Sequence, residues 1–425
     1  MRTPHYADDL VTVYHGDCLD VLAELPDNSV DAVVTDPPYG LSNTDADHVI
    51  DTLTRWINGE RDYIPSGAGF MGKAWDAFVP PAAVWDECSR VLKPGGHLLV
   101  FAGSRTVDLM GLAIRLAGFE VRDQLQYLYG SGFPKSLDVS KAIDKAAGAE
   151  REVVGTQVAA IAPGSGNYIN GPRVEVPRTG APATPDAERW QGFGTALKPA
   201  HEPIVLARKP LIGTVAGNVL AHGTGALNID GCRIGTTVET WPATRSYAPG
   251  QMQPGHVGET QGTGEAPPGR WPANVVLDPD AAALLDEQSG VRPGGNYPEA
   301  RGESKATAFA SGRQPGDSEA RSMGDTGGAS RFFYTSKAGS DERPRVDGIA
   351  HPTVKPLDLM RWLVRLVTPP GGVVLEPFAG SGTTLEACVI EGFRAIGIER
   401  EDDYLRLIEA RLTKPIQPDM FGGVA

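Results

Sequence analysis

The stretch VVLEPFAGSGTTLEACVIEGFRAIGIERE, residues 373–401, decides the fold. Its runs VVLE and RAIGIE predict two strands, and the segment between them predicts a glycine turn that opens a helix. Gly380 and Gly382 flank a serine in that turn, where glycine lets the backbone bend sharply and approach a ligand. The second strand ends in Glu399, and an acid at this place suits the two hydroxyls of a ribose. No basic residue is placed for a pyrophosphate, so the pattern favours a nucleoside cofactor without phosphates; an ordinary tight turn of an α/β protein is the alternative.

Strands and helices alternate in the same way elsewhere in the chain. Apolar runs predict further strands at 11–17, 31–34, 97–103 and 120–130, and helical spacing predicts helices at 18–26, about 81–91, 106–119 and 356–368. Helices between strands indicate βαβ units with a mostly parallel sheet, so the fold class is α/β. The middle, from about Gly130 to Arg345, is rich in Gly, Pro, Ser and Thr and interrupts this pattern as a loop-rich insert.

The segment TDPPYG, residues 35–40, follows one of these buried strands. Proline fixes φ and extends the residue before it, so Asp36 is expected at the strand end with a stiff turn behind it. Asp36 and the carbonyl of Pro37 can accept the two N–H groups of a base amino group, which localises the nitrogen lone pair. Tyr39 can stack on the ring of the base, a contact worth about 1–3 kcal/mol. A strand-end turn with a capping aspartate is the alternative interpretation.

Two further segments supply polar side chains whose roles stay open. In HPTVKP, residues 351–356, Thr353 can cap the following helix, or Lys355 can instead meet a carboxylate on the ligand. Asp17 either caps the helix that begins after it or lines the crevice at the carboxyl ends of the strands, where ligands bind in α/β sheets.

Composition sets limits on the protein. The net charge of −14 argues against a chain coated in basic residues, although nucleic-acid binding needs only a local basic surface. The four cysteines are scattered without a CxxC pair, no His/Asp/Glu cluster has metal spacing, and no apolar run is long enough to span a bilayer. With no signal peptide in MRTPHYADDL, we expect a cytoplasmic protein without a metal site.

DPPY, FAGSGTT and HPTVKP, in this order, resemble the S-adenosylmethionine-dependent DNA amino-methyltransferases of the β group, over roughly residues 8–130, 198–211 and 346–412. The resemblance implies a Rossmann-like methyltransferase fold, circularly permuted, with helices on both faces of the sheet. It divides the chain into a catalytic half (1–130), an inserted loop with a role in DNA contact (131–197), a returning strand (198–215), a loop-rich target-recognition region (216–345), a cofactor-binding half (346–416) and a tail (417–425).

The resemblance also implies roles for individual residues. Asp36, Pro37, Pro38 and Tyr39 would hold a flipped target base. The residues implied at the cofactor, S-adenosylmethionine, are Asp17, Thr353, Lys355, Glu376, Phe378, Gly380, Gly382 and Glu399. The chain departs from the family at Glu376, where aspartate is more common, and in its long glycine-rich middle.

The activity implied is methyl transfer to N6 of adenine in double-stranded DNA, with N4 of cytosine as the alternative, since DPPY leans toward adenine and SPPY toward cytosine. A non-catalytic DNA- or cofactor-binding protein is disfavoured by the intact Asp36, and a protein glutamine methyltransferase by the motif order. A cognate restriction endonuclease and a homodimer are partners that the family suggests. The basic residues expected at DNA, or else only solvated, are Lys135, Arg331, Lys337, Arg343 and Arg345.

Overall fold

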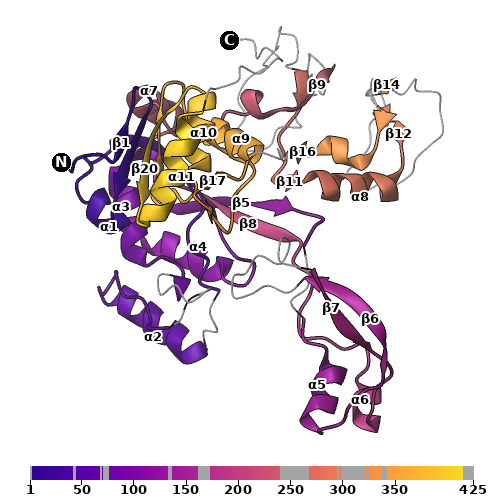
Figure 1. The fold of residues 1–425 in the computed structure, drawn as a ribbon. Helices are drawn as coiled ribbons and strands as arrows, with labels where there is room; N and C mark the ends of the chain where they lie inside the picture. The colour runs from indigo at the N-terminus through magenta and orange to yellow at the C-terminus, as the bar shows by residue number, and fades with distance from the viewer. Residues whose placement is uncertain are drawn as a thin grey trace, which may run out of the picture.

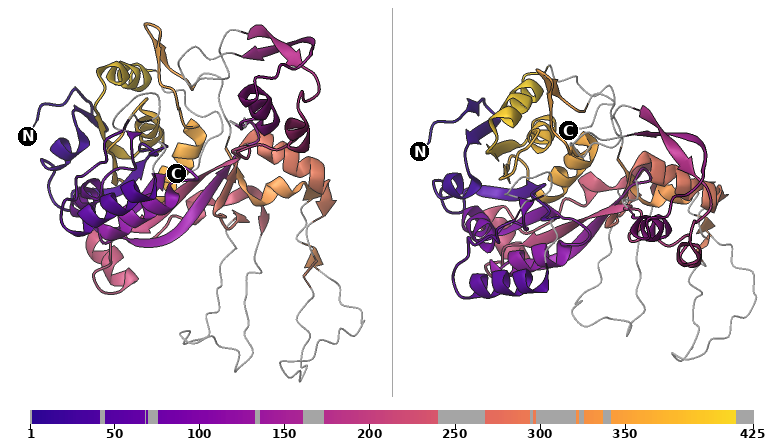
Figure 2. Two further views of the ribbon diagram at one scale, coloured as in Figure 1. Left: turned by 90° about the horizontal axis from the view of Figure 1, so that it is seen from below. Right: turned by 60° about the horizontal axis from the view of Figure 1, so that its bottom comes forward.

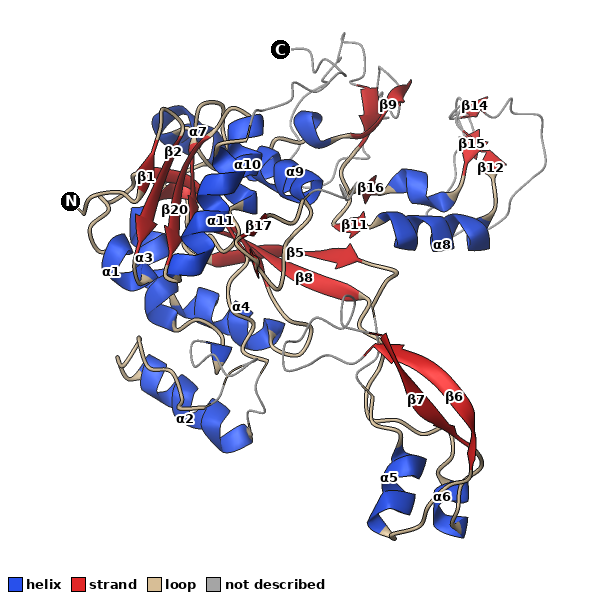
Figure 3. Cartoon of the chain, viewed as in Figure 1, coloured by secondary structure: helices blue, strands red, loops and turns tan. Residues whose placement is uncertain are grey.

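The computed structural model describes residues 2–41, 45–67, 69, 76–132, 136–160, 173–239, 268–293, 296–297, 321–322, 326–336 and 342–414. A ten-stranded sheet runs through the main body (Figures 1 and 3). In spatial order its strands are β1 (Tyr6–Ala7), β2 (Val11–His15), β20 (Arg394–Glu399), β19 (Val373–Glu376), β3 (Val30–Thr35), β4 (Leu92–Phe101), β8 (His201–Arg208), β5 (Glu120–Leu128), β11 (Val275–Leu277) and β16 (Tyr334–Thr335).

All neighbouring strands of this sheet are parallel except at β1 and β8, which are antiparallel to the strands beside them. The carboxyl ends of the parallel strands therefore share one edge of the sheet. Because β8 runs the opposite way, its first residues, His201 and Glu202, lie at that same edge.

Helices cover both faces of the sheet, as the fold class predicts. Successive side chains of a strand point to opposite faces, so Val34 packs in a core with α9 (Leu357–Val367), α10 (Thr383–Ile390) and α11 (Asp402–Leu412). Val33 packs on the other face with α1 (Cys18–Leu22), α3 (Ala82–Val91) and α4 (Val107–Leu116). The predicted α/β fold with a mostly parallel sheet is confirmed.

The chain changes direction across the sheet between β3 and β19. From β3 it passes through α3 to β4 on one side, and from β19 it passes through α10 to β20 on the other. Since α3 and α10 lie on opposite faces, the chain leaves β3 and β19 toward opposite faces of the sheet. The carboxyl ends of these two strands therefore form a topological switch point, called the crevice below. Ligands of open α/β sheets bind at such a switch point.

The insert contains more regular structure than its composition suggests. Two of its strands, β11 and β16, extend the sheet beyond β5 in the parallel direction. Residues after β5 form an arm of α5 (Val139–Ala146), β6 (Val153–Ala160), β7 (Arg173–Thr179) and α6 (Pro185–Arg189), which projects from the body (Figure 2). At the far end of the arm, the carboxylate of Asp144 in α5 accepts hydrogen bonds from Arg151 and from Thr184, the N-cap residue of α6. Residues 136–160 and 173–197 of the segment expected as an inserted loop thus form a folded arm.

The remaining elements surround this framework and complete the described chain. They are α2 (Ala46–Ile57), α7 (Val215–His222), η3 (Asp230–Cys232), β9 (Ile234–Glu239), β10 (Pro268–Arg270), α8 (Pro279–Ser289), β12 (Arg292–Pro293), β13 (Asn296–Tyr297), β14 (Arg321–Ser322), β15 (Thr326–Gly327), η4 (Ala329–Phe332), β17 (Arg345–Val346) and β18 (Ile349–Ala350). Across the described part of the chain, none of the helices has the length and apolar character needed to cross a membrane.

Candidate active site

The turn after β3 is anchored on both sides. Asp36 follows the buried strand directly, and its side chain is 20% exposed. The carbonyl of Tyr39 accepts a hydrogen bond from Thr106 Oγ1 at 2.6 Å, and the Gly40 N–H donates to Asp76 Oδ1 at 2.9 Å. Gly40 has φ +62°, and a Cβ there would lie 2.5 Å from the backbone at Phe78, so only glycine fits. The stiff turn that the prolines predict is thus fixed in place.

Glu376 ties the ends of β3 and β19 together across the crevice. Its carboxylate accepts hydrogen bonds from Thr35 Oγ1, Thr384 Oγ1 (2.7 Å) and the Phe378 N–H (3.1 Å), and the residue is 1% exposed. Burial raises the pKa of Glu376 to about 8, outweighing the three donors that stabilise its charged form. The buried position makes Glu376 a structural link between two sides of the crevice. We call the side of Asp36, expected at the base, the base side, and the side of the glycine turn, expected at the cofactor, the cofactor side.

The glycine turn after β19 has the geometry that its sequence predicts. Gly380 and Gly382 have φ of +53° and +78°, both in the left-handed region. The Gly380 N–H donates to Glu399 Oε2 at 2.6 Å, and a Cβ on Gly380 would lie 3.1 Å from Nε2 of His351. Gly382 is the N-cap residue of α10, so the turn leads directly into the N-terminus of that helix.

Glu399 and Asp17 lie on neighbouring strand ends. His15 of β2 is paired with Glu399 of β20, and the Gly16 N–H donates to the Glu399 carbonyl at 3.0 Å. Burial raises the pKa of Glu399 to about 7. The carboxylate accepts hydrogen bonds from the backbone N–H groups of Glu401 and Gly380, which act to lower the pKa but do not outweigh burial. Asp17 caps α1 by accepting the N–H of Leu19 at 3.0 Å, and its side chain is 45% exposed. Asp17 therefore caps α1, and it also lies near the carboxyl end of β2, beside the crevice.

The segment 351–356 crosses from the glycine turn to Asp36. The Lys355 ammonium lies 2.6 Å from Asp36 Oδ2, so the structure brings together two residues that are 319 positions apart in the sequence. Thr353 does not cap α9: the N-cap residue is Pro356, and the first N–H of the helix donates to Glu342. The backbone of Thr353 contacts Nδ1 of His351 instead, which shapes the loop over Gly380.

The basic residues expected at DNA differ in their surroundings. Arg343 and Arg345 are exposed near β17, whereas the Arg331 guanidinium donates to the carbonyls of Gly327 and Gly328. Lys135 and Lys337 lie outside the described residues.

Sequence reasoning missed Glu202, whose carboxylate lies 3.4 Å from Lys355 Nζ and accepts the Tyr39 hydroxyl at 3.3 Å. Glu202 reaches this edge of the sheet because β8 runs antiparallel to its neighbours. The apolar pattern of a strand does not show in which direction the strand runs.

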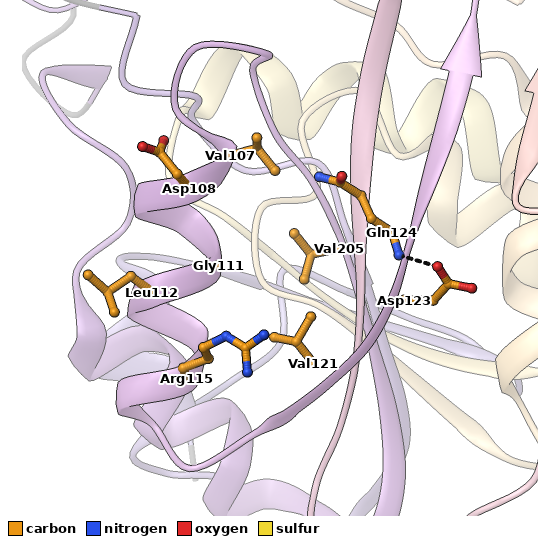
Figure 4. Close-up of a pocket in the computed structure, with 9 residues that line it drawn as sticks. All are labelled: Val107, Asp108, Gly111, Leu112, Arg115, Val121, Asp123, Gln124 and Val205. Atoms are coloured by element: carbon orange, nitrogen blue, oxygen red, sulfur yellow. Dashed lines mark hydrogen bonds between the residues drawn. The ribbon is translucent and has the colours of Figure 1, made fainter.

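A second surface feature lies away from this crevice. A hollow of about 450 Å³ opens between α4 and β5, with Val107, Leu112, Arg115, Val121 and Gln124 among its lining residues (Figure 4). None of the expected site residues lines it. Among the described residues, no three His, Cys, Asp or Glu side chains are grouped so that they could hold a metal ion.

The structure is an α/β framework in which the carboxylate of Asp36 ends β3 and a glycine turn joins β19 to α10. The chain belongs to the DNA methylase family, whose family model matches residues 30–410. This membership supports S-adenosylmethionine as the cofactor that the sequence implies.

Curated relatives match over short stretches. The chain is 32% identical over 99 residues to the type II methyltransferase M.BamHI of Bacillus amyloliquefaciens, covering 23% of this chain and 19% of that protein. It is 43% identical over 75 residues to the putative methylase YubD of Escherichia coli (strain K12), covering 18% and 33%. The chain thus spans only a fifth to a third of the length of these relatives.

Solved structures match over nearly the whole chain at low identity. The complex of M1.HpyAVI with SAM has a TM-score of 0.39 at 15% identity, covering 95% of this chain and 100% of that one. The PvuII DNA methyltransferase, titled cytosine-N4-specific, has a TM-score of 0.42 at 12% identity, covering 98% and 92%.

Proposed function

We propose that the protein transfers a methyl group from S-adenosylmethionine to the exocyclic N6 of adenine in double-stranded DNA. The observation that carries the proposal is the position of Asp36, at the carboxyl end of β3 on the switch-point crevice, across Glu376 from the glycine turn. A base held at Asp36 and a cofactor held at Gly380 would share one crevice.

The residues on the cofactor side fit a nucleoside. Glu399 keeps acceptor capacity on both carboxylate oxygens beyond the two backbone N–H groups that it binds, which suits the donor hydroxyls of a ribose. An added Cβ would lie 3.1 Å from His351 at Gly380 and 3.2 Å from Ile408 at Gly382, so these two glycines keep the turn tight at the place proposed for the cofactor. When bound, S-adenosylmethionine supplies a methyl group on a positively charged sulfur.

The residues on the base side would prepare the nucleophile. Asp36 and the Pro37 carbonyl accept the two N–H groups of the target amine, and the half-buried ring of Tyr39 stacks on the base. A bond forms between the amine nitrogen and the methyl carbon as the sulfur–carbon bond breaks, with the bonding pair left on sulfur. Asp36 stabilises the positive charge that develops on nitrogen before one proton leaves.

The proposal is tested by expressing the protein in a host that lacks adenine and cytosine amino-methylation, digesting its DNA to nucleosides and analysing them by mass spectrometry. We expect N6-methyladenine with the wild-type protein and a loss of at least about 100-fold with Asp36→Ala. Detection of N4-methylcytosine instead would mean that the target base is cytosine, not adenine. No methylated base from a protein that binds S-adenosylmethionine would refute the proposal.

The names of the type II relatives also suggest a place in a restriction–modification system with a cognate endonuclease. Sequencing of the modified DNA would give the recognition site. Gel filtration and light scattering would test the predicted homodimer.

A further inference from the structure

The Lys355 ammonium is enclosed by two carboxylates and two aromatic rings. Its Nζ lies 2.6 Å from Asp36 and 3.4 Å from Glu202, and 5.3 Å and 4.9 Å from the ring centres of Tyr39 and Phe101. The side chain is only 10% exposed. Burial acts to lower the pKa of Lys355, but the two carboxylates outweigh it and raise the pKa, so the amine is charged.

This arrangement conflicts with the task of Asp36. Under the proposed function, Asp36 must accept an N–H of the target amine and offset the positive charge that develops on its nitrogen. The carboxylate keeps acceptor sites for the N–H, but the Lys355 ammonium at Oδ2 already offsets its negative charge. A buried ammonium that loses its only counter-charge pays a desolvation penalty of several kcal/mol. Release of Asp36 is therefore feasible only where a second carboxylate keeps Lys355 neutralised.

Glu202 is placed to be that second carboxylate. It lies near the start of β8, opposite Tyr127 of β5, and its side chain is 27% exposed. Glu202 also accepts the hydroxyl of Tyr39 at 3.3 Å, so one carboxylate reaches both the ammonium and the ring expected to stack on the base. With two acids and one base, this group carries a net charge of −1, which complements the positive charge of the cofactor sulfur.

We propose that Glu202 is a positioning residue that holds Lys355 against the pocket wall and so frees Asp36 for the target amine. The inference rests on the proposed function, because the competition for Asp36 arises only when a base amine binds there. Glu202 contacts neither reacting atom and acts through Lys355 and Tyr39.

The test measures the single-turnover rate of methyl transfer to DNA at saturating cofactor, together with the Kd of the cofactor by calorimetry. Glu202→Gln keeps the shape and an acceptor for Tyr39 but removes the charge, so we expect a rate loss of about 10- to 100-fold with the cofactor Kd changed less than about threefold. Glu202→Asp, which retains the charge, should lose clearly less than Glu202→Gln.

A double-mutant cycle with Lys355→Met separates this role from a merely structural one. If Glu202 acts through Lys355, then Glu202→Gln in the Lys355→Met background should reduce the rate by less than about twofold further. Additive losses, or a Glu202→Gln rate equal to that of the wild type, would overturn the inference while leaving the proposed function intact.

The matched control is Glu120→Gln, which breaks the ion pair of Glu120 with Arg208 at the other end of β8. We expect its rate to equal that of the wild type, and a loss equal to that of Glu202→Gln would show that disturbance of β8, not charge at Lys355, causes the effect. Wild-type protein that methylates no DNA would refute the proposed function itself, a result distinct from active wild type with an unaffected Glu202→Gln.

Discussion

The two sides of the crevice are built in different ways. On the cofactor side, the key contacts involve the backbone and lie close in sequence or on adjacent strands: the Gly380 N–H meets Glu399, and the Gly16 N–H meets the Glu399 carbonyl. On the base side, the contacts join side chains across long stretches of chain. Lys355 and Asp36 are 319 residues apart, and Tyr39 and Glu202 are 163 apart.

The difference bears on both rigidity and chemistry. A backbone turn that needs glycine at positive φ tolerates few substitutions, so the geometry of the cofactor side depends on the backbone conformation of its turn. The base side depends on a balance of buried charges, where removal of one partner leaves another uncompensated. We therefore expect substitutions on the cofactor side to change affinity and stability, and those on the base side to change rate.

The largest effect expected on the cofactor side is that of Gly382→Ala. Gly382 has φ +78°, which costs a residue with a Cβ about 1–2 kcal/mol, and its Cβ would lie 3.2 Å from Ile408 of α11. The start of α10 would shift, so we expect the cofactor Kd, measured by calorimetry, to rise about tenfold or more. The free energy of unfolding should fall by more than the strain alone.

Gly392→Ala is the matched control for this experiment. Gly392 has nearly the same φ, +76°, at the opposite end of α10, and no atom lies within 4 Å of its added Cβ. Its substitution should lower the free energy of unfolding by about 1–2 kcal/mol and leave the cofactor Kd within about twofold. Equal affinity in both variants would mean that the turn at Gly382 does not hold the cofactor.

The same contrast explains how far sequence reasoning reached. Strand, glycine turn, helix and acid lie within residues 373–401, so local chemistry predicted the turn and the place of Glu399. The role of Glu202 depends on β8 running antiparallel, and the addition of β11 and β16 depends on pairing with β5, both set by tertiary contacts. Thr353 resembled a cap because a helix begins soon after it, but the structure places Pro356 at that position.

A second prediction concerns the pH dependence of cofactor binding. Burial, with a contribution from the charge of Glu401, raises the pKa of Glu399 to about 7. If its ionised form accepts the ribose hydroxyls, the fraction able to bind grows as pH rises through 7. We expect the affinity to increase about tenfold from pH 6 to pH 8 and then level off.

Calorimetry of S-adenosylmethionine with wild type and Glu399→Gln checks this expectation. The variant has no ionisable group at the site, so its weaker binding should be nearly independent of pH over the same range. A wild-type affinity that stays constant from pH 6 to pH 8 would contradict a direct role for the Glu399 carboxylate at the cofactor.

The last prediction concerns the pH dependence of stability, at the link between the two sides. The pKa of Glu376 is raised from its ordinary value of 4.5 to about 8 in the folded protein, chiefly by burial. Between these values the folded state binds more protons than the unfolded state, so this group makes the free energy of unfolding fall as pH rises. It has no effect of this kind below pH 4.5.

Glu376→Gln lacks this titration, so its free energy of unfolding relative to the wild type should increase by about 3 kcal/mol from pH 5 to pH 8, as measured by urea denaturation. Glu24→Gln, which removes an exposed carboxylate paired with Arg2, should show no such trend. A difference between Glu376→Gln and wild type that stays constant with pH would mean that Glu376 is ionised in the folded protein at all these pH values. The hydrogen bonds from Thr35 and Thr384 would then outweigh burial, and the link between the two sides would be a buried anion.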